Sequence, residues 1–322
     1  MPDNIENSPK SIPGSVQSVT LADANLLSDI SPWDLRYHQI DKGRLRVDVA
    51  MMAGTCLNVL DFKSNLGLHQ LGSAPQGAVT LGIPIAGALP TWGHKDVSSG
   101  TLLSFGSGVE FDGVSRGYFH GLTFSLPETR FNVLCDKLGF ANLETIRHFG
   151  LLTTNEPTLN RKLLSKFVLK MLSGDGPELT PQAEDEISSE LLASMTDGDP
   201  RHADKSSPAS RNKARKRAIE VMHHLAPSAA RISEICAEAG VGWRTLDRAF
   251  LEHFGFGPKS YFKILRLSRV RNEIASHGPQ MSVIDAATRW GFSHMSQFSK
   301  DYRELFHELP SETQTRWKRG VH

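Results

Sequence analysis

Two stretches decide the fold of the last third of the chain: ISEICAEAGVGWRTLDRAFLEHFGFGPKSYFKILRLSRVRNEI at residues 232–274, and VIDAATRWGFSHMSQFSKDYRELFHELPSE at residues 283–312. The second stretch repeats the first. Ile232, Ile235 and Gly240 recur 51 positions later as Val283, Ala286 and Gly291, and Leu246, Arg248, Phe250 and Phe254 recur 52 positions later as Phe298, Lys300, Tyr302 and Phe306. Each copy reads as a short helix, a glycine-containing turn and a longer helix, which predicts two tandem helix-turn-helix units.

The residues around the two copies predict that the whole C-terminal region is helical. Apolar residues recur at helical spacing between breaks such as Gly255, Pro258 and Gly278-Pro279. One long helix joins the two units, and other helices precede and follow them. The expected helices cover Asn212–Leu225, Ile232–Ala239, Arg244–Phe254, Lys259–Ser276, Val283–Trp290, Met295–Leu305 and Pro310–Trp317.

Charge is unevenly distributed along the chain. Residues 209–322 hold 19 Lys and Arg against 11 Asp and Glu, a net charge of +8, whereas residues 1–208 hold 17 basic and 24 acidic residues, a net charge of −7. A basic end beside an acidic body favours a polyanionic partner for the basic end, and an ordinary solvated surface is the alternative. The same alternatives, phosphate contact or solvated helix face, apply to the run RNKARKR at Arg211–Arg217.

A polar segment separates this basic region from the rest. Thr196–Ser210, TDGDPRHADKSSPAS, has two prolines and no apolar cluster, so we interpret residues 196–210 as a linker. The start of the chain is also polar, and residues 1–30 are predicted to be a disordered leader. Residues 31–195 are then a separate front domain, and residues 211–322 are the helix-turn-helix domain.

The front domain is predicted to be rich in β-structure. From Trp33 to Ser125, short apolar runs such as LNVLDF (57–62) and AVTLGIPI (78–85) alternate with turn residues, which is typical of a sandwich or barrel. Helical spacing follows at Pro127–Leu138, Leu159–Leu172 and Thr180–Met195. The expected fold class is therefore α+β, with a β-rich N-terminal domain that also carries helices and an all-α C-terminal domain.

The second of these helices carries an apolar stripe with two interpretations. The stripe consists of Leu163, Leu164, Phe167, Val168, Met171 and Leu172. It either packs on the β-structure or forms a dimer interface, because an apolar stripe does not name what covers it.

The repeated C-terminal pattern resembles the DNA-binding region of AraC/XylS transcription regulators over Arg211–Trp317. The specific signals are Arg289-Trp290-Gly291-Phe292, Ser296-Gln297-Phe298-Ser299-Lys300, and Gly257-Pro258 followed by Tyr261 and Arg266-Leu267. Three positions depart from the family pattern. Gly242 replaces a serine that caps the recognition helix, Lys300 replaces an arginine, and His307 replaces a glycine. These changes weaken local capping and alter base preference, but leave the fold intact.

The resemblance implies that the second helix of each unit lies in the major groove of double-stranded DNA. It implies base contacts at Arg244, Asp247, Arg248, Met295, Ser296 and Lys300, with Arg303 also outward. Arginine pairs with guanine through two donors, aspartate accepts from cytosine, and Met295 offers apolar contact to a thymine methyl. Ser293 and Gln297 are expected on phosphates, which position the protein without reading sequence. The alternative for each is an ordinary exposed helix position.

By the same resemblance, residues 31–195 are the effector-binding and dimerisation domain, a cupin-like barrel followed by helices, whose mouth binds a small-molecule effector. The candidate ligand-binding residues are Trp92, His94, Phe111, Arg116, Tyr118 and His120, together with His69. The histidines lack the clustered spacing of a cupin metal site, so no metal and no cofactor are expected. No catalytic residues are predicted either: the chain has no Gly-x-Ser-x-Gly elbow, P-loop or dinucleotide fingerprint.

The sequence is thus interpreted as a sequence-specific, DNA-binding transcriptional regulator, more consistent with an activator, that responds to a small molecule. The expected partners are an operator DNA, RNA polymerase, the effector and a second copy of the chain, without a membrane. An apolar run long enough to cross a bilayer is missing, and Cys56, Cys135 and Cys236 are widely spaced, which favours a cytoplasmic protein. One alternative is that the front half only dimerises or binds a protein; a more distant one is a DNA-modifying enzyme.

Overall fold

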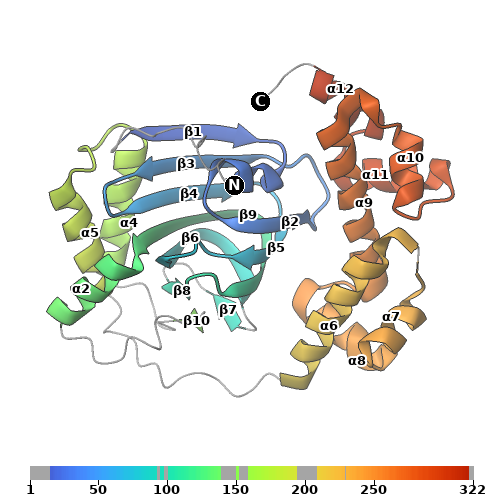
Figure 1. Ribbon diagram of the computed structural model, residues 1–322, viewed down its shortest axis with the longest axis horizontal. Helices are drawn as coiled ribbons and strands as arrows, with labels where there is room; N and C mark the ends of the chain where they lie inside the picture. The colour runs from blue at the N-terminus through green and yellow to red at the C-terminus, as the bar shows by residue number, and fades with distance from the viewer. Residues whose placement is uncertain are drawn as a thin grey trace, which may run out of the picture.

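The computed structural model describes residues 15–92, 95–97, 101–138, 150–151, 159–193, 209–228 and 230–318. These residues form a curled β-sheet with helices on one side and a separate group of helices on the other (Figure 1). The second group comprises the C-terminal helices, drawn in yellow to red, and it lies beside the edge of the sheet formed by β2 and β5.

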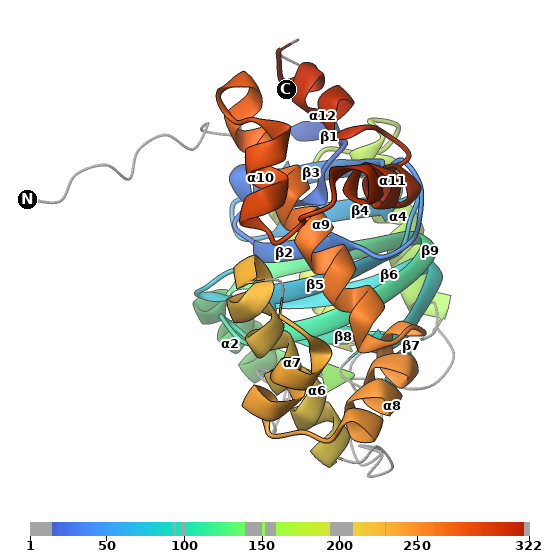
Figure 2. The same ribbon diagram turned by 90° about the vertical axis from the view of Figure 1, so that its right-hand side faces the viewer.

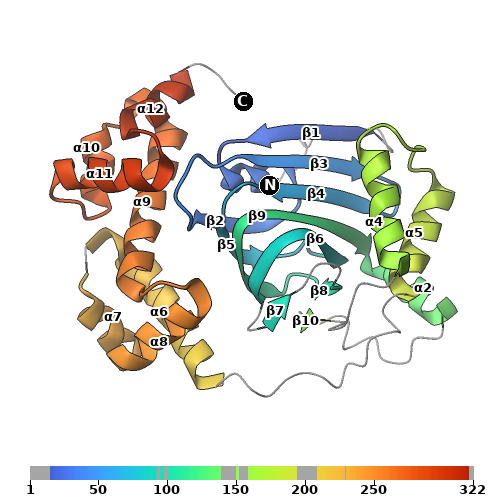
Figure 3. The same ribbon diagram turned by 180° about the vertical axis from the view of Figure 1, so that it is seen from behind.

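The described strands form one antiparallel sheet, in the order β1-β3-β4-β9-β6-β8-β10 with β2, β5 and β7 paired off this path. Strand β9 is the centre, because it pairs with β4, β5 and β6 at different points along its 18 residues. The sheet therefore curls into a half-barrel, which confirms the predicted β-rich domain (Figure 3). The strands are β1 (Val16–Leu21), β2 (Asp34–Gln39), β3 (Val47–Ala53), β4 (Asn58–Ser64), β5 (Leu68–Ser73), β6 (Ala78–Trp92), β7 (Lys95–Val97), β8 (Leu103–Phe105), β9 (Glu110–Pro127) and β10 (Gly150–Leu151).

The helices of the half-barrel domain are α1 (Leu27–Ile30), α2 (Glu128–Leu138), α4 (Leu159–Leu172) and α5 (Pro181–Ala193). The last three confirm the predicted helices and pack on the end of the sheet opposite the C-terminal helices (Figure 1). On α4, Leu164, Val168, Met171 and Leu172 are buried in the core of this domain, whereas Leu163 and Phe167 are 56% and 40% exposed. The stripe therefore packs mainly on the domain itself and leaves two apolar side chains uncovered.

The C-terminal helices lie within a few residues of their predicted bounds: α6 (Ala209–Leu225), α7 (Ile232–Ala239), α8 (Trp243–Phe254), α9 (Pro258–His277), α10 (Val283–Arg289), α11 (Met295–Phe306) and α12 (Pro310–Lys318). They form two helix-turn-helix units, α7–α8 and α10–α11, joined by α9 (Figure 2). Each unit has its own apolar cluster, one around Phe250 and Phe254 and the other around Phe298 and Tyr302.

Backbone geometry explains where these helices turn. Gly240 and Gly291 follow the first helix of each unit with φ of 64° and 77°, a region that glycine enters at little cost. His307 ends α11 in the same left-handed region, with φ 53°, where the family pattern has glycine. Gly242 precedes α8 without a side-chain cap, as its sequence implied.

The structure corrects one predicted boundary. Residues 1–30 were assigned to a disordered leader, but β1 pairs with β3 from Val16 to Leu21, and Leu27 is buried. The leader prediction is wrong for this part because an edge strand needs only alternate apolar residues to join a sheet. Residues 1–14 and most of the predicted linker lie outside the described residues, and α6 already begins at Ala209. Among the described helices, none combines the length and apolarity needed to cross a membrane.

Candidate nucleic-acid interface and sensor cavity

The first recognition helix, α8, has a buried side and an exposed side as its sequence predicted. Leu246, Ala249, Phe250 and Phe254 are buried, because they face the core formed with α6, α7 and α9. The opposite side carries the predicted DNA contacts Arg244 and Arg248, which are exposed, and Asp247, which is half-buried. Trp243 and Leu251 lie at 50% and 48% exposure on the same helix.

The second recognition helix, α11, repeats this arrangement. Phe298, Tyr302 and Leu305 are buried against α9, α10 and α12. The other predicted contacts are exposed on α11 or just before it, apart from Met295, which is half-buried: Ser293, Met295, Ser296, Gln297, Lys300 and Arg303. Lys300 and Arg303 also line an open hollow whose opposite wall includes Lys42 of the half-barrel domain.

Two of these side chains already have partners within the chain. The Arg248 Nε donates to Glu252 Oε1 at 3.0 Å, one helical turn away, and the Gln297 Nε2 donates to Asp301 Oδ1 at 3.0 Å. Both pairs are exposed, and exposed pairs of this kind stabilise a helix only slightly. Arg248 and Gln297 can therefore exchange these partners for DNA at small cost.

Helix α9 fixes the second unit relative to the first. Its 20 residues span roughly 30 Å at the α-helical rise, close to the spacing of successive major grooves on one duplex face. Near its middle, the Arg266 Nε donates to the carbonyl of Trp290 at 2.6 Å, and its guanidinium stacks over Phe292 at 4.4 Å from the ring centre. The turn of the second unit is thereby held on the connecting helix.

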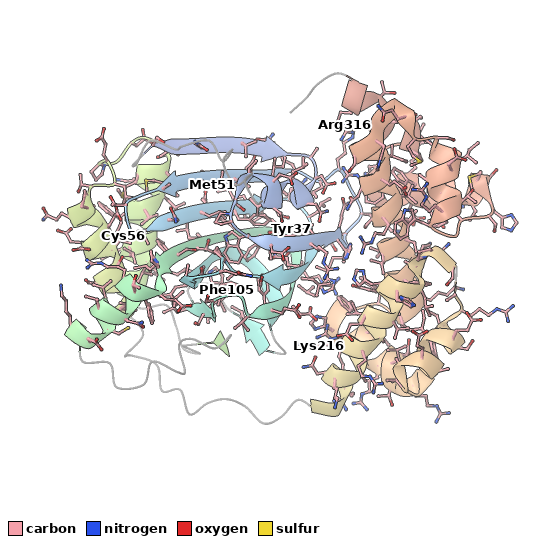
Figure 4. The ribbon with its side chains drawn as sticks, in the orientation of Figure 1. Tyr37, Met51, Cys56, Phe105, Lys216 and Arg316 are labelled. Carbon is pink, nitrogen blue, oxygen red and sulfur yellow. The ribbon has the colours of Figure 1, made fainter. Side chains whose placement is uncertain are left out.

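The basic run Arg211–Arg217 is divided between solvent and the domain interface. Lys213, Lys216 and Arg217 are exposed, but Arg215 is buried and pairs with Asp112 of β9. Figure 4 labels Lys216 on this helix. Arg215 is thus unavailable to a phosphate in this arrangement, and neither sequence interpretation of the run included its burial against the half-barrel.

Asp112 is the centre of a buried hydrogen-bond network between the two domains. Its Oδ2 accepts from the Arg215 guanidinium, and its Oδ1 lies 2.9 Å from His69 Nε2 and 3.2 Å from His253 Nε2. The Tyr261 hydroxyl lies 2.9 Å from His69 Nδ1. Although burial alone would raise it, these three partners hold the pKa of Asp112 well below its usual range.

A second group of buried side chains lies beside this network. The ring of His38 in β2 lies against that of His223 in α6, with 5.5 Å between ring centres and an angle of 38° between their planes, and neither His38 nitrogen has a hydrogen-bond partner among the described residues. Arg269 of α9 donates to His223 Nδ1 at 3.0 Å. We call the two groups together the inter-domain network: His38, His69 and Asp112 from the half-barrel, and Arg215, His223, His253, Tyr261 and Arg269 from the C-terminal helices.

The nitrogens of His69 and His253 and a carboxylate oxygen of Asp112 lie within 4.8 Å of one another, so their donor atoms could hold a metal ion. The electrostatics fit a metal poorly. Arg215 already neutralises the carboxylate, and a divalent cation would add two further charges beside a buried guanidinium. Imidazole N–H groups that donate to Asp112 satisfy the same geometry at less cost.

An apolar cavity lies within the half-barrel. It has a volume of about 60 Å³, and its lining is almost entirely apolar, with Gln70 and Thr123 as polar exceptions. Aromatic rings supply much of the wall: Trp33, Tyr37, Phe62, Phe105, Phe111 and Phe119. Tyr37 and Phe105, labelled in Figure 4, reach it from β2 and β8.

The candidate ligand-binding residues are scattered. Phe111 lines the cavity, whereas Arg116 packs against Phe256 of the C-terminal helices, Tyr118 is half exposed, and His120 bonds to Asp61 at 2.5 Å on another face. Along β9, Phe111, Phe119, Gly121 and Thr123 line the cavity, so Arg116, Tyr118 and His120, at the alternating positions between them, face away from it. The Trp92 side chain and His94 lie outside the described residues.

Comparison with known proteins agrees with the two-unit arrangement. Residues 215–316 match the family model of a helix-turn-helix domain. The regulatory protein HrpB of Ralstonia nicotianae is 37% identical over 81 residues, which are 25% of this chain and 17% of HrpB. The XylDLEGF operon transcriptional activator of Pseudomonas putida is 33% identical over 79 residues, which are 24% of this chain and 25% of that protein. The chain thus matches only a quarter or less of each of these two relatives.

A solved structure is matched over nearly its whole length. The crystal structure of a probable AraC family transcriptional regulator from Rhodopseudomonas palustris is 30% identical in sequence, over 33% of this chain and 97% of that chain, with a TM-score of 0.30. The sequence identity of 30% over nearly the whole of that chain carries the assignment. The chain therefore belongs to the AraC/XylS family of transcriptional regulators.

Proposed function

We propose that the protein regulates transcription by inserting α8 and α11 into neighbouring major grooves of an operator. The observation that carries this proposal is the pair of exposed recognition-helix faces joined by one long helix, α9. The names of the matched relatives include transcriptional activators. This favours activation over repression, with RNA polymerase as the partner. The alternative function, that of a DNA-modifying enzyme, has no comparable support, because these relatives are named as regulators.

The exposed side chains divide into those that read bases and those that hold the backbone. Arg244, Arg248 and Lys300 are the base-reading cations, with Asp247, Met295 and Ser296 beside them. Ser293, Gln297 and Arg303 hold phosphates at the start and outer edge of α11. This division follows the geometry of helix-turn-helix docking, in which the N-terminal half of the recognition helix meets base edges.

Selection of bound DNA from a random pool, followed by affinity measurements on operator variants, tests this proposal. Arg244→Ala or Arg248→Ala should weaken binding by about 1–3 kcal/mol and relax preference at one base pair. Lys137→Ala, which removes an exposed charge on α2 of the half-barrel, is the matched control and should leave preference unchanged. If both arginine variants discriminate between operators as the parent does, this docking is wrong.

We further propose that the cavity in the half-barrel receives a small, mainly apolar effector. A space of about 60 Å³ holds a few water molecules, so an effector of metabolite size must displace lining side chains as it enters. The strands that carry these side chains, β2, β5 and β9, also face the C-terminal helices. Effector binding would thus move the surface on which the first helix-turn-helix unit rests.

Thermal-shift measurements against a panel of apolar metabolites test the effector proposal, because a ligand that binds only the folded state raises the melting temperature. Leu103→Phe narrows the cavity and should abolish the shift without changing the fold. If no compound stabilises the parent protein, the alternative function of the front domain, dimerisation or protein binding alone, is favoured.

We propose that the protein forms a homodimer through α4. The support is the pair of exposed apolar side chains, Leu163 and Phe167, on a helix whose Leu164, Val168, Met171 and Leu172 are buried in the domain core. Leu163→Glu should shift the sedimentation coefficient to that of a monomer, whereas Lys166→Glu, an exposed change on the same helix, should not. A parent protein that sediments as a monomer at all concentrations contradicts the proposal.

A further inference from the structure

The inter-domain network contains four histidines, whose unperturbed pKa lies closest to neutral pH among ordinary side chains, and it lies between the two domains rather than on the exposed faces of α8 and α11. Here the successive side chains of β2, β5 and β9 point alternately to the two sides of the half-barrel wall. Tyr37, Gln70 and Phe111 line the cavity, while the adjacent His38, His69 and Asp112 face the C-terminal helices. The sheet registers pair Tyr37 with Gln70 and His38 with His69.

His38 lies in surroundings that cannot accommodate a positive charge. It is 4% exposed, and the titratable and charged groups that act on it are His69, His223, Arg269 and Arg36. All of these are cationic or can become so. Burial, with the added effect of these groups, lowers the pKa of His38 well below its usual value.

His223 and His253 are constrained in the same direction. Burial lowers the pKa of His223 to about 3, helped by Arg269, Arg36 and His69. Burial and Arg215 outweigh the attraction of Asp112 and lower the pKa of His253 to about 4, with His69 acting in the same sense. Both side chains are buried or half-buried at the contact with the half-barrel, and separation of the domains would expose them to water.

We propose that the inter-domain network is a proton-sensitive latch, which holds the C-terminal helices against the half-barrel at neutral pH and releases them as the pH falls. The proton acts here as a second effector, bound at a place distinct from the apolar cavity. The release itself does not depend on the proposed DNA binding, and its test uses no DNA.

The sign of the effect follows from linkage. A histidine freed into water titrates near pH 6.5, whereas the closed latch keeps these three neutral, so the open form binds more protons below that pH. Each such histidine multiplies the ratio of open to closed protein by about 10 between pH 7.5 and pH 5.5. Asp112 acts only at lower pH, because a free aspartate titrates near pH 3.9.

Small-angle X-ray scattering of the full chain across this pH range measures the release, and far-ultraviolet circular dichroism monitors folding in the same samples. The radius of gyration should rise as the pH falls from about 7.5 to about 5.5, while helix and strand signals stay constant. A constant radius throughout, or a rise that coincides with loss of the dichroism signal, would overturn the proposal.

His38→Phe is the sharpest variant, since His38 makes no hydrogen bond that the substitution could remove. At pH 5.5, the ratio of open to closed protein should be roughly tenfold lower in this variant than in the parent. His38→Gln is a second non-titrating variant in case the larger ring disturbs packing. His224→Gln, an exposed change on α6, should leave the profile unchanged. An unaltered profile in both His38 variants would show that His38 is not part of a proton switch.

Discussion

The two helix-turn-helix units resemble each other internally but are attached to the half-barrel in different ways. The apolar core of the first unit continues into the half-barrel through Ile40 and Val114, with Leu71 packed alongside. Within the described part of the chain, the core of the second unit contains no residue from that domain. The first unit also has the buried ion pair between Arg215 and Asp112.

The second unit contacts the half-barrel mainly at residues 39–43, at and just after the end of β2. The Gly43 amide donates to the carbonyl of Leu305 at 2.9 Å, the Gln39 Nε2 donates to the same carbonyl at 3.1 Å, and the Lys42–Glu304 ion pair is exposed. Arg271 of α9 adds a bond to the carbonyl of Ala22 at 2.9 Å and an ion pair with Asp23 at 3.4 Å, which is largely buried. Both attachments therefore include a buried charge, and the main difference is the apolar core that the first unit alone shares with the half-barrel among the described residues. Because of this shared core, the first unit should be the more firmly held of the two.

Asp112→Ala tests the firm attachment and has the largest expected effect. It leaves Arg215, whose side chain is 2% exposed, without its carboxylate, and should lower the free energy of unfolding by about 3–5 kcal/mol. Urea denaturation followed by circular dichroism measures the loss. Asp48→Ala, at the exposed pair with Arg46, is the control and should change stability far less. A loss in Asp112→Ala as small as in the control would mean that the ion pair does not hold the first unit.

Val114→Ala sharpens the same comparison through the shared apolar core. Val114 is fully buried among residues of the C-terminal helices, and removal of two methyl groups should cost about 2 kcal/mol. Calorimetry should show the C-terminal helices melting earlier relative to the half-barrel. Equal shifts of both domains would indicate that Val114 serves only the half-barrel itself.

His307→Gly addresses the second unit alone. His307 adopts φ 53° at the end of α11, and glycine tolerates this conformation without the steric cost of a side chain. The variant should be more stable by about 1 kcal/mol in urea denaturation. His307→Ala keeps the steric cost and should bring no gain, so equal stabilisation by both variants would contradict this explanation.

Lys42→Ala has the smallest expected effect. The Lys42–Glu304 pair is exposed on both sides, so screening by water and salt leaves it little to contribute. The melting temperature should stay within measurement error of the parent at physiological salt. A clear destabilisation, comparable to that of Val114→Ala, would mean that the second unit is held as firmly as the first.

Local sequence patterns sufficed for the elements of the C-terminal domain. The predicted helix Ile232–Ala239 has the observed bounds, and Leu246, Phe250, Phe298 and Tyr302 are buried as their spacing predicted. The exposed sides of α8 and α11 follow from the same periodicity. Contact of those sides with DNA remains a prediction.

The same reasoning did not find the inter-domain network. Arg215 and Asp112 are 103 positions apart, and Tyr261 and His69 are 192 apart. Nothing in the short basic run around Arg215 distinguishes the one buried arginine from its exposed neighbours. The candidate ligand residues Arg116 and His120 do not reach the cavity, because they alternate along β9 with Phe119 and Gly121, which line it, and the sequence pattern alone does not say which of the two sides faces inward.

The sequence by itself determined the two helical units, their turns and the β-rich character of the front domain, because helical and strand periodicities and glycine turns act over a few neighbouring residues. Only the tertiary structure decided which wall of the half-barrel faces the C-terminal helices. That choice depends on the curl of the sheet and on long-range packing, which together bring His38, His69 and Asp112 against Arg215 and His253.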